Sequence, residues 1–185
     1  MTKQEIRDQK LTARRNLDID EVIDFSLNIA TKLFATLEFQ NARVVHIYKS
    51  TPIEVSTIEI INKCFELAKR VVVPRTNSDC SNTEHIEIFA NTVFEKLYFG
   101  VFIPISNCKV FDLRSMARDD LFVIPVVAFD SRHNRIGYGK GCYDRFLSTV
   151  KCHKVGIAFS CQKTDKIVPK WFDVRLHKVI LPLLS

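Results

Sequence analysis

The chain has 185 residues, of which 46% are hydrophobic and 26% are charged, a composition typical of a soluble globular protein. No stretch approaches the ~20 consecutive apolar residues of a membrane span, and the polar beginning "MTKQEIRDQK" lacks the apolar core of a signal peptide, so we expect a cytoplasmic protein. Lys and Arg number 27 and Asp and Glu number 21, and the resulting net charge of +6 suits either an anionic small substrate or a nucleic acid.

The cysteines are spread along the chain. Six are present, at positions 64, 80, 108, 142, 152 and 161. No pair has the CxxC spacing of a zinc site or a redox motif. We therefore predict free thiols, without a disulfide framework or a structural zinc ion.

The first predicted element is a basic helix. The motif "TKQE" (2–5) has the spacing of a capping box, which marks a helix start. Basic side chains then recur at intervals of four, three and four residues and share one helix face: Lys3, Arg7, Lys10 and Arg14. The pattern alone favours a solvent-exposed face.

Helices and strands alternate over the following residues. An apolar stripe that begins near Asp20 predicts a second helix, and the run "ARVVHIY" (42–48) predicts a buried strand. A second capping-box pattern, formed by the serine and the glutamate of "STIE", opens a predicted helix over 56–70. Strands are predicted at 71–75, ending at its proline, and at 84–90.

The second half of the chain continues the alternation. Residues 91–118 contain a glycine and a proline and are predicted to be irregular. The apolar run 120–130 predicts a central strand with a break at the proline in its middle. A helix over 142–150 and two strands, at 154–160 and 178–184, complete the prediction.

Alternating strands and helices indicate an α/β protein. We predict a three-layer α/β/α sandwich with a mainly parallel central sheet. No repeat, linker or change of composition divides the chain, so we expect a single domain over residues 1–185.

Three of the five glycines lie within five positions of "NRIGYGKGCYDRF" (134–146): Gly137, Gly139 and Gly141. A glycine-rich turn between a strand and a helix suits phosphate binding, because bare backbone N–H groups can approach phosphate oxygens, and Lys140 adds a positive charge. The spacing is neither the GxGxxG of dinucleotide-binding turns nor a P-loop. A tight structural turn with a solvated lysine is the alternative.

Two charged residues flank these glycines. Arg135 precedes them, and Asp144 follows them. A carboxylate beside bound phosphates is unfavourable unless a cation lies between, and Mg²⁺ binds through one or two carboxylates and phosphate oxygens. The pattern therefore suggests a magnesium ligand, although an Asp in the first turn also complements the helix dipole.

The stretch "DLFVIPVVAFDSRHNRIGYGKGCYDRFL" (120–147) resembles the signature of the 5-formyltetrahydrofolate cyclo-ligase family, also called 5,10-methenyltetrahydrofolate synthetases. The family pattern there is a strand ending in P-G-x-x-F-D, a short turn, and then R-L-G-x-G-x-G-Y-Y-D-R. Shorter similarities follow the family's order over nearly the whole length: "KQEIR", "ARR", "PIE", "VPR", "FGVFIP" and "VPKWFD".

The resemblance implies a ligase that uses ATP and Mg²⁺ to convert 5-formyltetrahydrofolate to 5,10-methenyltetrahydrofolate, releasing ADP and phosphate. In that mechanism the formyl oxygen attacks the γ-phosphorus to give an imino phosphate, and N10 then closes the ring. The protein's task is positioning and charge neutralisation. We expect a monomer that takes a small folate substrate, with or without a polyglutamate tail, and has no nucleic-acid or membrane partner.

The resemblance also assigns roles to residues. The ATP would be bound by eight residues, of which the glycines, Arg135 and Lys140 would hold its phosphates: Lys3, Arg7, Arg135, Gly137, Gly139, Lys140, Gly141 and Tyr143. Of these, Lys140 and Arg135 would be catalytic, and Arg14 matches a further basic position. The folate would contact Glu54, Phe99 and Tyr143, and Mg²⁺ would be held by Asp144 and Asp173.

The sequence departs from the family pattern at several positions. Cys142 stands at the first of two usual tyrosines, Val126 and Val127 follow the proline where small residues are usual, and His177 stands where an Asp is common. Asn134 replaces a usual glycine, and because Asn tolerates left-handed backbone better than most residues, we predict that the turn survives.

Two other functions fit the same residues. A non-catalytic relative on this scaffold could bind RNA or another polyanion, although the aromatic residues are not interleaved with basic ones as a stacking surface requires. A sugar-phosphate isomerase-like enzyme would need a base near the phosphate site, and Glu54 does not exclude it.

Overall fold

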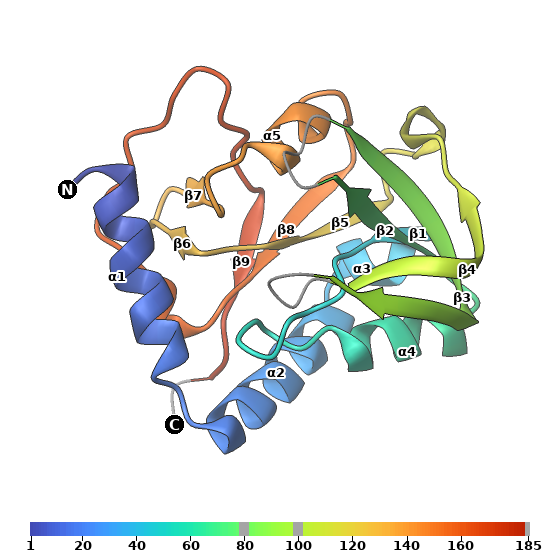
Figure 1. Cartoon of the computed structure of the whole chain (residues 1–185), viewed down its shortest axis with the longest axis horizontal. Helices are drawn as coiled ribbons and strands as arrows, with labels where there is room; N and C mark the ends of the chain where they lie inside the picture. Colours follow the sequence, from blue (N-terminus) through green and yellow to red (C-terminus); the bar gives the residue numbers. More distant parts are fainter. Residues whose placement is uncertain (78–81, 98–101, 184–185) are drawn as a thin grey trace.

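A seven-stranded sheet forms the centre of the computed structural model, which describes residues 1–77, 82–97 and 102–183 (Figure 1). Five strands run parallel: β2 (Arg70–Thr76), β1 (Val44–His46), β5 (Leu121–Pro125), β8 (His153–Ile157) and β9 (Lys178–Ile180). Two antiparallel strands, β3 (Thr83–Lys96) and β4 (Phe102–Val110), extend the edge beside β2. The order is β4-β3-β2-β1-β5-β8-β9, so the prediction of an α/β fold with a mainly parallel sheet is confirmed.

Helices cover both faces of this sheet (Figure 1). One face carries α2 (Ile19–Phe34), α3 (Leu37–Asn41) and α4 (Ile58–Glu66), and the other carries α5 (Cys142–Leu147). Within the part of the chain that the structure describes, no helix has the length and apolar character needed to cross a bilayer.

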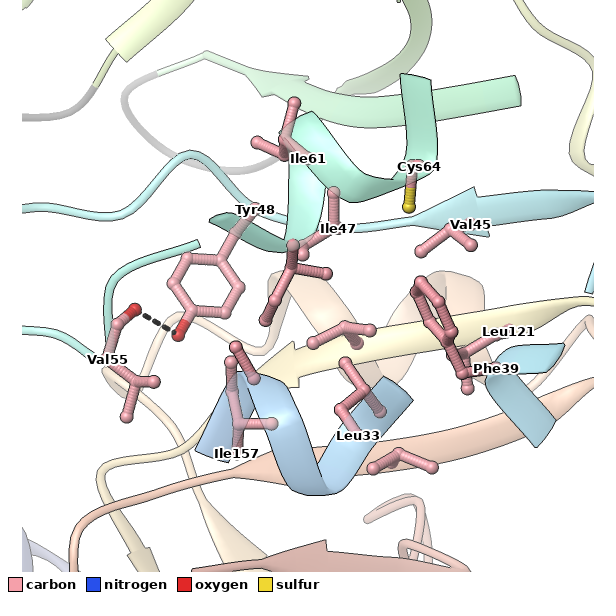
Figure 2. Packing of buried hydrophobic residues seen from close by; sticks show 14 of the residues in the cluster. Leu33, Phe39, Val45, Ile47, Tyr48, Val55, Ile61, Cys64, Leu121 and Ile157 are labelled. Carbon is pink, nitrogen blue, oxygen red and sulfur yellow. Dashed lines mark hydrogen bonds between the residues drawn. The ribbon is translucent and has the colours of Figure 1, made fainter. Parts of the chain in front are cut away.

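The buried side chains of β5 show how the two layers share one strand. Leu121 packs into the cluster beneath α2 and α4, whereas Phe122 packs with Phe146 of α5 on the opposite face. This follows from the alternation of side chains along a strand. Figure 2 shows the α2 side, where the Tyr48 hydroxyl donates to the Val55 carbonyl at 3.0 Å and holds the segment after β1 against the core.

Of the two capping boxes predicted from the sequence, the structure has the one at the N-terminus but not the one at α4. Thr2 caps α1 (Lys3–Arg15) with both bonds of the predicted capping box. The box predicted at Ser56 is wrong, because Thr57 is the N-cap residue and makes no cap bond. The Thr57 hydroxyl donates instead to the Tyr48 carbonyl at 2.8 Å, so it contacts the segment after β1 and does not cap the helix.

The irregular segment predicted over 91–118 is wrong in its first part, since β3 runs to Lys96 and β4 spans Phe102–Val110. It is confirmed over 111–118, where the structure has only a short 3-10 helix at Leu113–Ser115. A register shift between Ile88 and Val93 lets β3 bend and continue its pairing. Pro104 is tolerated because β4 is the edge strand, where a missing N–H leaves no neighbour unpaired. The break predicted in the 120–130 run is confirmed, because β5 ends at Pro125.

Four cysteines are free thiols, as predicted: Cys64, Cys108, Cys152 and Cys161. Burial raises the pKa of the Cys64 thiol to about 12, which makes it unreactive at neutral pH. Cys142 is disulfide-bonded, so the prediction of free thiols is wrong there. The spacing of cysteines in the sequence reveals only local motifs such as CxxC. It does not show which distant cysteines the fold brings together.

Candidate functional site

The predicted site residues gather beyond the carboxyl ends of the parallel strands. Glu54 follows β1, the glycine loop (residues 137–141) follows β5, and Asp173 follows β8. Between β5 and the glycine loop, β6 (Ala128–Phe129) and β7 (Arg135–Ile136) form a small antiparallel pair. Ligands of open α/β sheets bind at this edge.

Helix α1 is held over the β6–β7 pair by a small apolar cluster. Ile6 is buried there with Ala128, Ile136 and Ile167. From this helix Arg7 and Arg14 reach the glycine loop, and Arg14 is only 2% exposed. The interpretation of a solvent-exposed basic face is wrong for Arg14, because the sequence pattern cannot show which elements pack on a polar face.

The Arg7 side chain lies against the glycine backbone. Its Nε donates to the Gly137 carbonyl at 2.9 Å. At Gly139 the backbone has φ +100°, and a Cβ added there would lie 3.1 Å from the Arg7 Cζ, so only glycine suits the position. A Cβ added at Gly137 or at Gly141 would meet nothing within 4 Å. Open space thus lies beside two of the three glycines.

Arg135 and Asp144 form an ion pair rather than two separate sites. The Arg135 Nη2 donates to Asp144 Oδ1 at 2.8 Å, and the Arg135 side chain is only 4% exposed. Arg135 also donates to the Val174 carbonyl, while the Val174 N–H donates to the same Asp144 oxygen at 2.9 Å. The pair therefore fastens the start of α5 to the segment that carries Asp173.

Lys3 and Asp173 are also paired with each other. The Lys170 N–H donates to the same Asp173 oxygen, Oδ2, at 2.6 Å. Among the residues that the structure describes, no cluster of three or more His, Cys, Asp or Glu side chains is arranged to hold a metal ion. The two acidic candidates are thus brought to one region without forming a complete metal site by themselves.

Glu54 is buried, with 6% of the residue exposed, and its carboxylate is held by its own turn. The Thr51 N–H and hydroxyl both donate to Oε2, at 2.8 and 3.0 Å. Tyr143 is partly buried against Phe146, with ring centroids 5.0 Å apart. Burial, and then the Glu54 carboxylate, hold the pKa of the Tyr143 phenol above its usual value, so it stays protonated. Lys140 is exposed at the surface of the loop, and Phe99 lies outside the described residues.

Two polar residues of this region were not predicted from the sequence to belong to the site. The Tyr138 hydroxyl donates to Glu54 Oε1 at 2.7 Å and joins the glycine loop to the Glu54 turn. Its signal in the sequence is a large aromatic residue placed between two glycines. Asp130 is buried and accepts from the N–H groups of Arg132, at 3.0 Å, and Ile167, at 3.0 Å, which fixes the turn before β7.

The expectation that Asn134 takes the left-handed position of this turn is wrong. The left-handed position is His133, with φ 62°, and not Asn134. Asn134 instead donates from both its backbone N–H and its side-chain amide to Asp130, each at 2.9 Å. The turn survives as predicted, but through hydrogen bonds to a buried carboxylate.

Known proteins resemble this chain over nearly its full length. The model of the 5-formyltetrahydrofolate cyclo-ligase family matches residues 1–182. A probable 5-formyltetrahydrofolate cyclo-ligase of Caenorhabditis elegans is 29% identical, covering 96% of this chain and 91% of that protein. The 5-formyltetrahydrofolate cyclo-ligase of Mycoplasma pneumoniae is 31% identical, covering 97% of this chain and 98% of that protein.

Solved structures agree with the sequence comparison. A 5,10-methenyltetrahydrofolate synthetase from Mycoplasma pneumoniae superimposes with a TM-score of 0.76 at 28% identity, covering 97% of this chain and 98% of the other. The Aquifex aeolicus 5,10-methenyltetrahydrofolate synthetase gives a TM-score of 0.83 at 25% identity, with 98% and 90% covered. The sequence match, the relatives and the fold lead to one conclusion: this chain belongs to the 5-formyltetrahydrofolate cyclo-ligase family.

Proposed function

We propose that this protein uses the energy of ATP to cyclise 5-formyltetrahydrofolate to 5,10-methenyltetrahydrofolate, with release of ADP and phosphate. Membership of a ligase family that acts on this folate supports the reaction. An amide-like formyl oxygen is a poor leaving group, and its phosphorylation gives an imino phosphate from which phosphate departs readily. The formyl oxygen attacks the γ-phosphorus, and N10 then attacks the activated carbon and closes the ring.

The observation that carries the proposal is the open space beside Gly137 and Gly141, next to basic side chains of α1. Phosphate oxygens need N–H donors that no side chain covers and positive charge close by. Arg7 holds the Gly137 carbonyl, so it fixes the loop and brings a guanidinium to its edge. Lys140, exposed in the loop, and Lys3, paired with Asp173, add further positive charge to the predicted site. Catalysis of phosphoryl transfer rests on such positioning and charge neutralisation.

The acidic residues fit a magnesium ion that arrives with the nucleotide. Asp144 uses Oδ1 and Asp173 uses Oδ2 in their ion pairs, and within residues 1–77, 82–97 and 102–183 no hydrogen bond reaches the other oxygen of either carboxylate. Mg²⁺ favours one or two carboxylates together with phosphate oxygens and water. Bound there, it would neutralise phosphate charge and polarise the transferred group.

The remaining residues act on the folate and on the loop. Glu54 offers a carboxylate to the adjacent N–H donors of the pterin, as carboxylates do toward forked donors. Tyr143 lines the same region as a protonated phenol. Arg135 acts through Asp144, because their ion pair orients the carboxylate, while Lys140 stabilises the charge of the transferred phosphoryl group.

The test is a direct assay. Purified protein is mixed with 5-formyltetrahydrofolate, ATP and Mg²⁺, and the near-ultraviolet absorbance of the methenyl product is followed over time. We expect product and ADP in equal amounts, and no product when ATP is left out. Product without ATP consumption, or no product with all three components, contradicts the proposal.

A further inference from the structure

A chain of hydrogen bonds joins α1, the glycine loop and the turn that carries Glu54. The Arg14 Nη2 donates to the Tyr138 hydroxyl at 2.7 Å, and that hydroxyl donates to Glu54 Oε1 at 2.7 Å. The direction is fixed, because a guanidinium has only donors and a carboxylate has only acceptors. Half of Tyr138 is exposed, yet its hydroxyl lies between the two charged groups; burial and then Glu54 hold the pKa of the phenol above its usual value. The hydroxyl therefore keeps the proton that it donates.

Both charged ends of this series of hydrogen bonds use the hydroxyl as a partner. Arg14 is 2% exposed, its Nη1 donates to the Val126 carbonyl at 3.4 Å, its Nε has no hydrogen-bond partner, and no carboxylate in the described part of the chain forms an ion pair with it. A buried guanidinium without an ion-pair partner is stabilised by a hydrogen bond to a polarised acceptor. The Tyr138 hydroxyl is such an acceptor, because it donates its own proton to the Glu54 carboxylate. Glu54 has Oε2 fixed by Thr51, so Tyr138 is the group that fixes Oε1.

The position of Tyr138 in the chain gives this contact its significance. Tyr138 lies between Gly137 and Gly139, in the backbone that would bind the nucleotide phosphates. Any adjustment of that backbone around phosphates moves the hydroxyl relative to Glu54. The turn that carries Glu54 belongs to a different part of the chain, and its own bonds to Thr51 do not depend on the loop.

We propose that Tyr138 is a positioning residue that couples the binding of nucleotide at the glycine loop to the orientation of Glu54 for the folate. The inference rests on the proposed function and adds a coupling between its two substrates. Bound phosphates fix the loop in place, so the hydroxyl keeps its hydrogen bond to Oε1 and the carboxylate stays oriented toward the pterin N–H donors. Because such coupling is reciprocal, the folate also tightens the binding of nucleotide.

The experiment measures the dissociation constant of 5-formyltetrahydrofolate by calorimetry, with and without a non-hydrolysable ATP analogue and Mg²⁺. For the unaltered protein we expect the analogue to tighten folate binding at least about fivefold. Tyr138→Phe keeps the ring and removes the hydroxyl, so folate binding weakens about tenfold and the effect of the analogue disappears. Thr51→Val is the matched control: it removes a hydroxyl from the other oxygen of Glu54, so folate binding weakens but the effect of the analogue is kept.

Several outcomes overturn the inference. They are an unaltered protein without any effect of the analogue, a Tyr138→Phe variant that keeps the effect, and a Thr51→Val variant that loses it equally. Removal of the hydroxyl leaves one donor of the buried Arg14 without its partner, so the phenylalanine variant should melt several degrees lower than the unaltered protein but stay folded at 25 °C. Its melting temperature is measured alongside, and binding is compared below the melting transition. Absence of methenyl product from the unaltered protein contradicts the proposed function, whereas an active protein with an unaffected Tyr138→Phe variant contradicts this inference alone.

Discussion

Replacement of Gly137 by alanine separates the binding of phosphate from the stability of the fold. The backbone at Gly137 lies outside the left-handed region, and the added methyl group would meet no atom within 4 Å. We therefore expect the free energy of unfolding to change by less than about 0.5 kcal/mol, as at an unconstrained surface position. The methyl group would occupy the space proposed for phosphate oxygens. A loss of about 1.4 kcal/mol in binding would raise the KM for ATP about tenfold.

Two other glycines provide the comparison. Gly139→Ala combines a φ of +100° with a contact of 3.1 Å to Arg7, and the backbone strain alone costs about 1–2 kcal/mol. Gly156→Ala, in β8, would place the methyl group 2.6 Å from the Leu176 Cδ1 and 2.9 Å from the Val126 Cγ2, within the core. Such overpacking costs about 1–3 kcal/mol. Only the first of these two variants should change the binding of ATP.

The assay follows melting by circular dichroism and the KM for ATP by the absorbance of the methenyl product. At about 2–4 °C per kcal/mol for a chain of this size, Gly156→Ala should melt several degrees lower with an unchanged KM. Gly137→Ala should show the reverse, an unchanged melting temperature with a raised KM. A folded Gly137→Ala variant with the KM of the unaltered protein would refute the phosphate-binding role of this loop.

Three more predictions test individual side chains. Lys140→Ala should lower turnover by about 100-fold or more without changing the melting temperature, because the side chain is exposed; normal turnover rules out its catalytic role. Asp144→Asn removes the charge that faces buried Arg135, so it should lower the melting temperature and raise the Mg²⁺ concentration needed for activity. If the variant and the unaltered protein need the same Mg²⁺ concentration, Asp144 has a structural role alone. Burial holds the pKa of His46 well below 6.5 and lowers that of His85 to about 4, so both rings fold in the neutral form and stability present above pH 6.5 is lost as the pH falls toward 4. Chemical denaturation at pH 7.5 and 5.0 should show this loss, and a His85→Asn variant with an equal loss would contradict it.

The sequence was sufficient for features that depend on local chemistry. The capping box at Thr2, the break at Pro125 and the glycine loop all follow from residues that are neighbours in the chain, and the structure has the first two as predicted. The continuation of β3 to Lys96 was not predicted, because a register shift and an edge strand are properties of the partner and not of the segment itself.

The same limit applies to the candidate site. The pairing of Arg135 with Asp144 joins a predicted phosphate ligand to a predicted metal ligand, and nothing in their spacing in the sequence shows that they meet. Arg14 matched a basic position without a defined role, and its burial depends on how α1 packs over β6 and β7. Residue types thus indicated the chemistry, whereas their partners required the fold.

The ion pair between Lys3 and Asp173 joins residues 170 positions apart, and this separation constrains how the protein matures. During translation α1 is made well before the residues that hold it in place. Its apolar partners Ala128, Ile136 and Ile167, like Asp173, lie more than a hundred positions later in the sequence. The nascent protein therefore carries a basic segment before its acidic and apolar partners exist, and α1 can take its native place only after they have been synthesised.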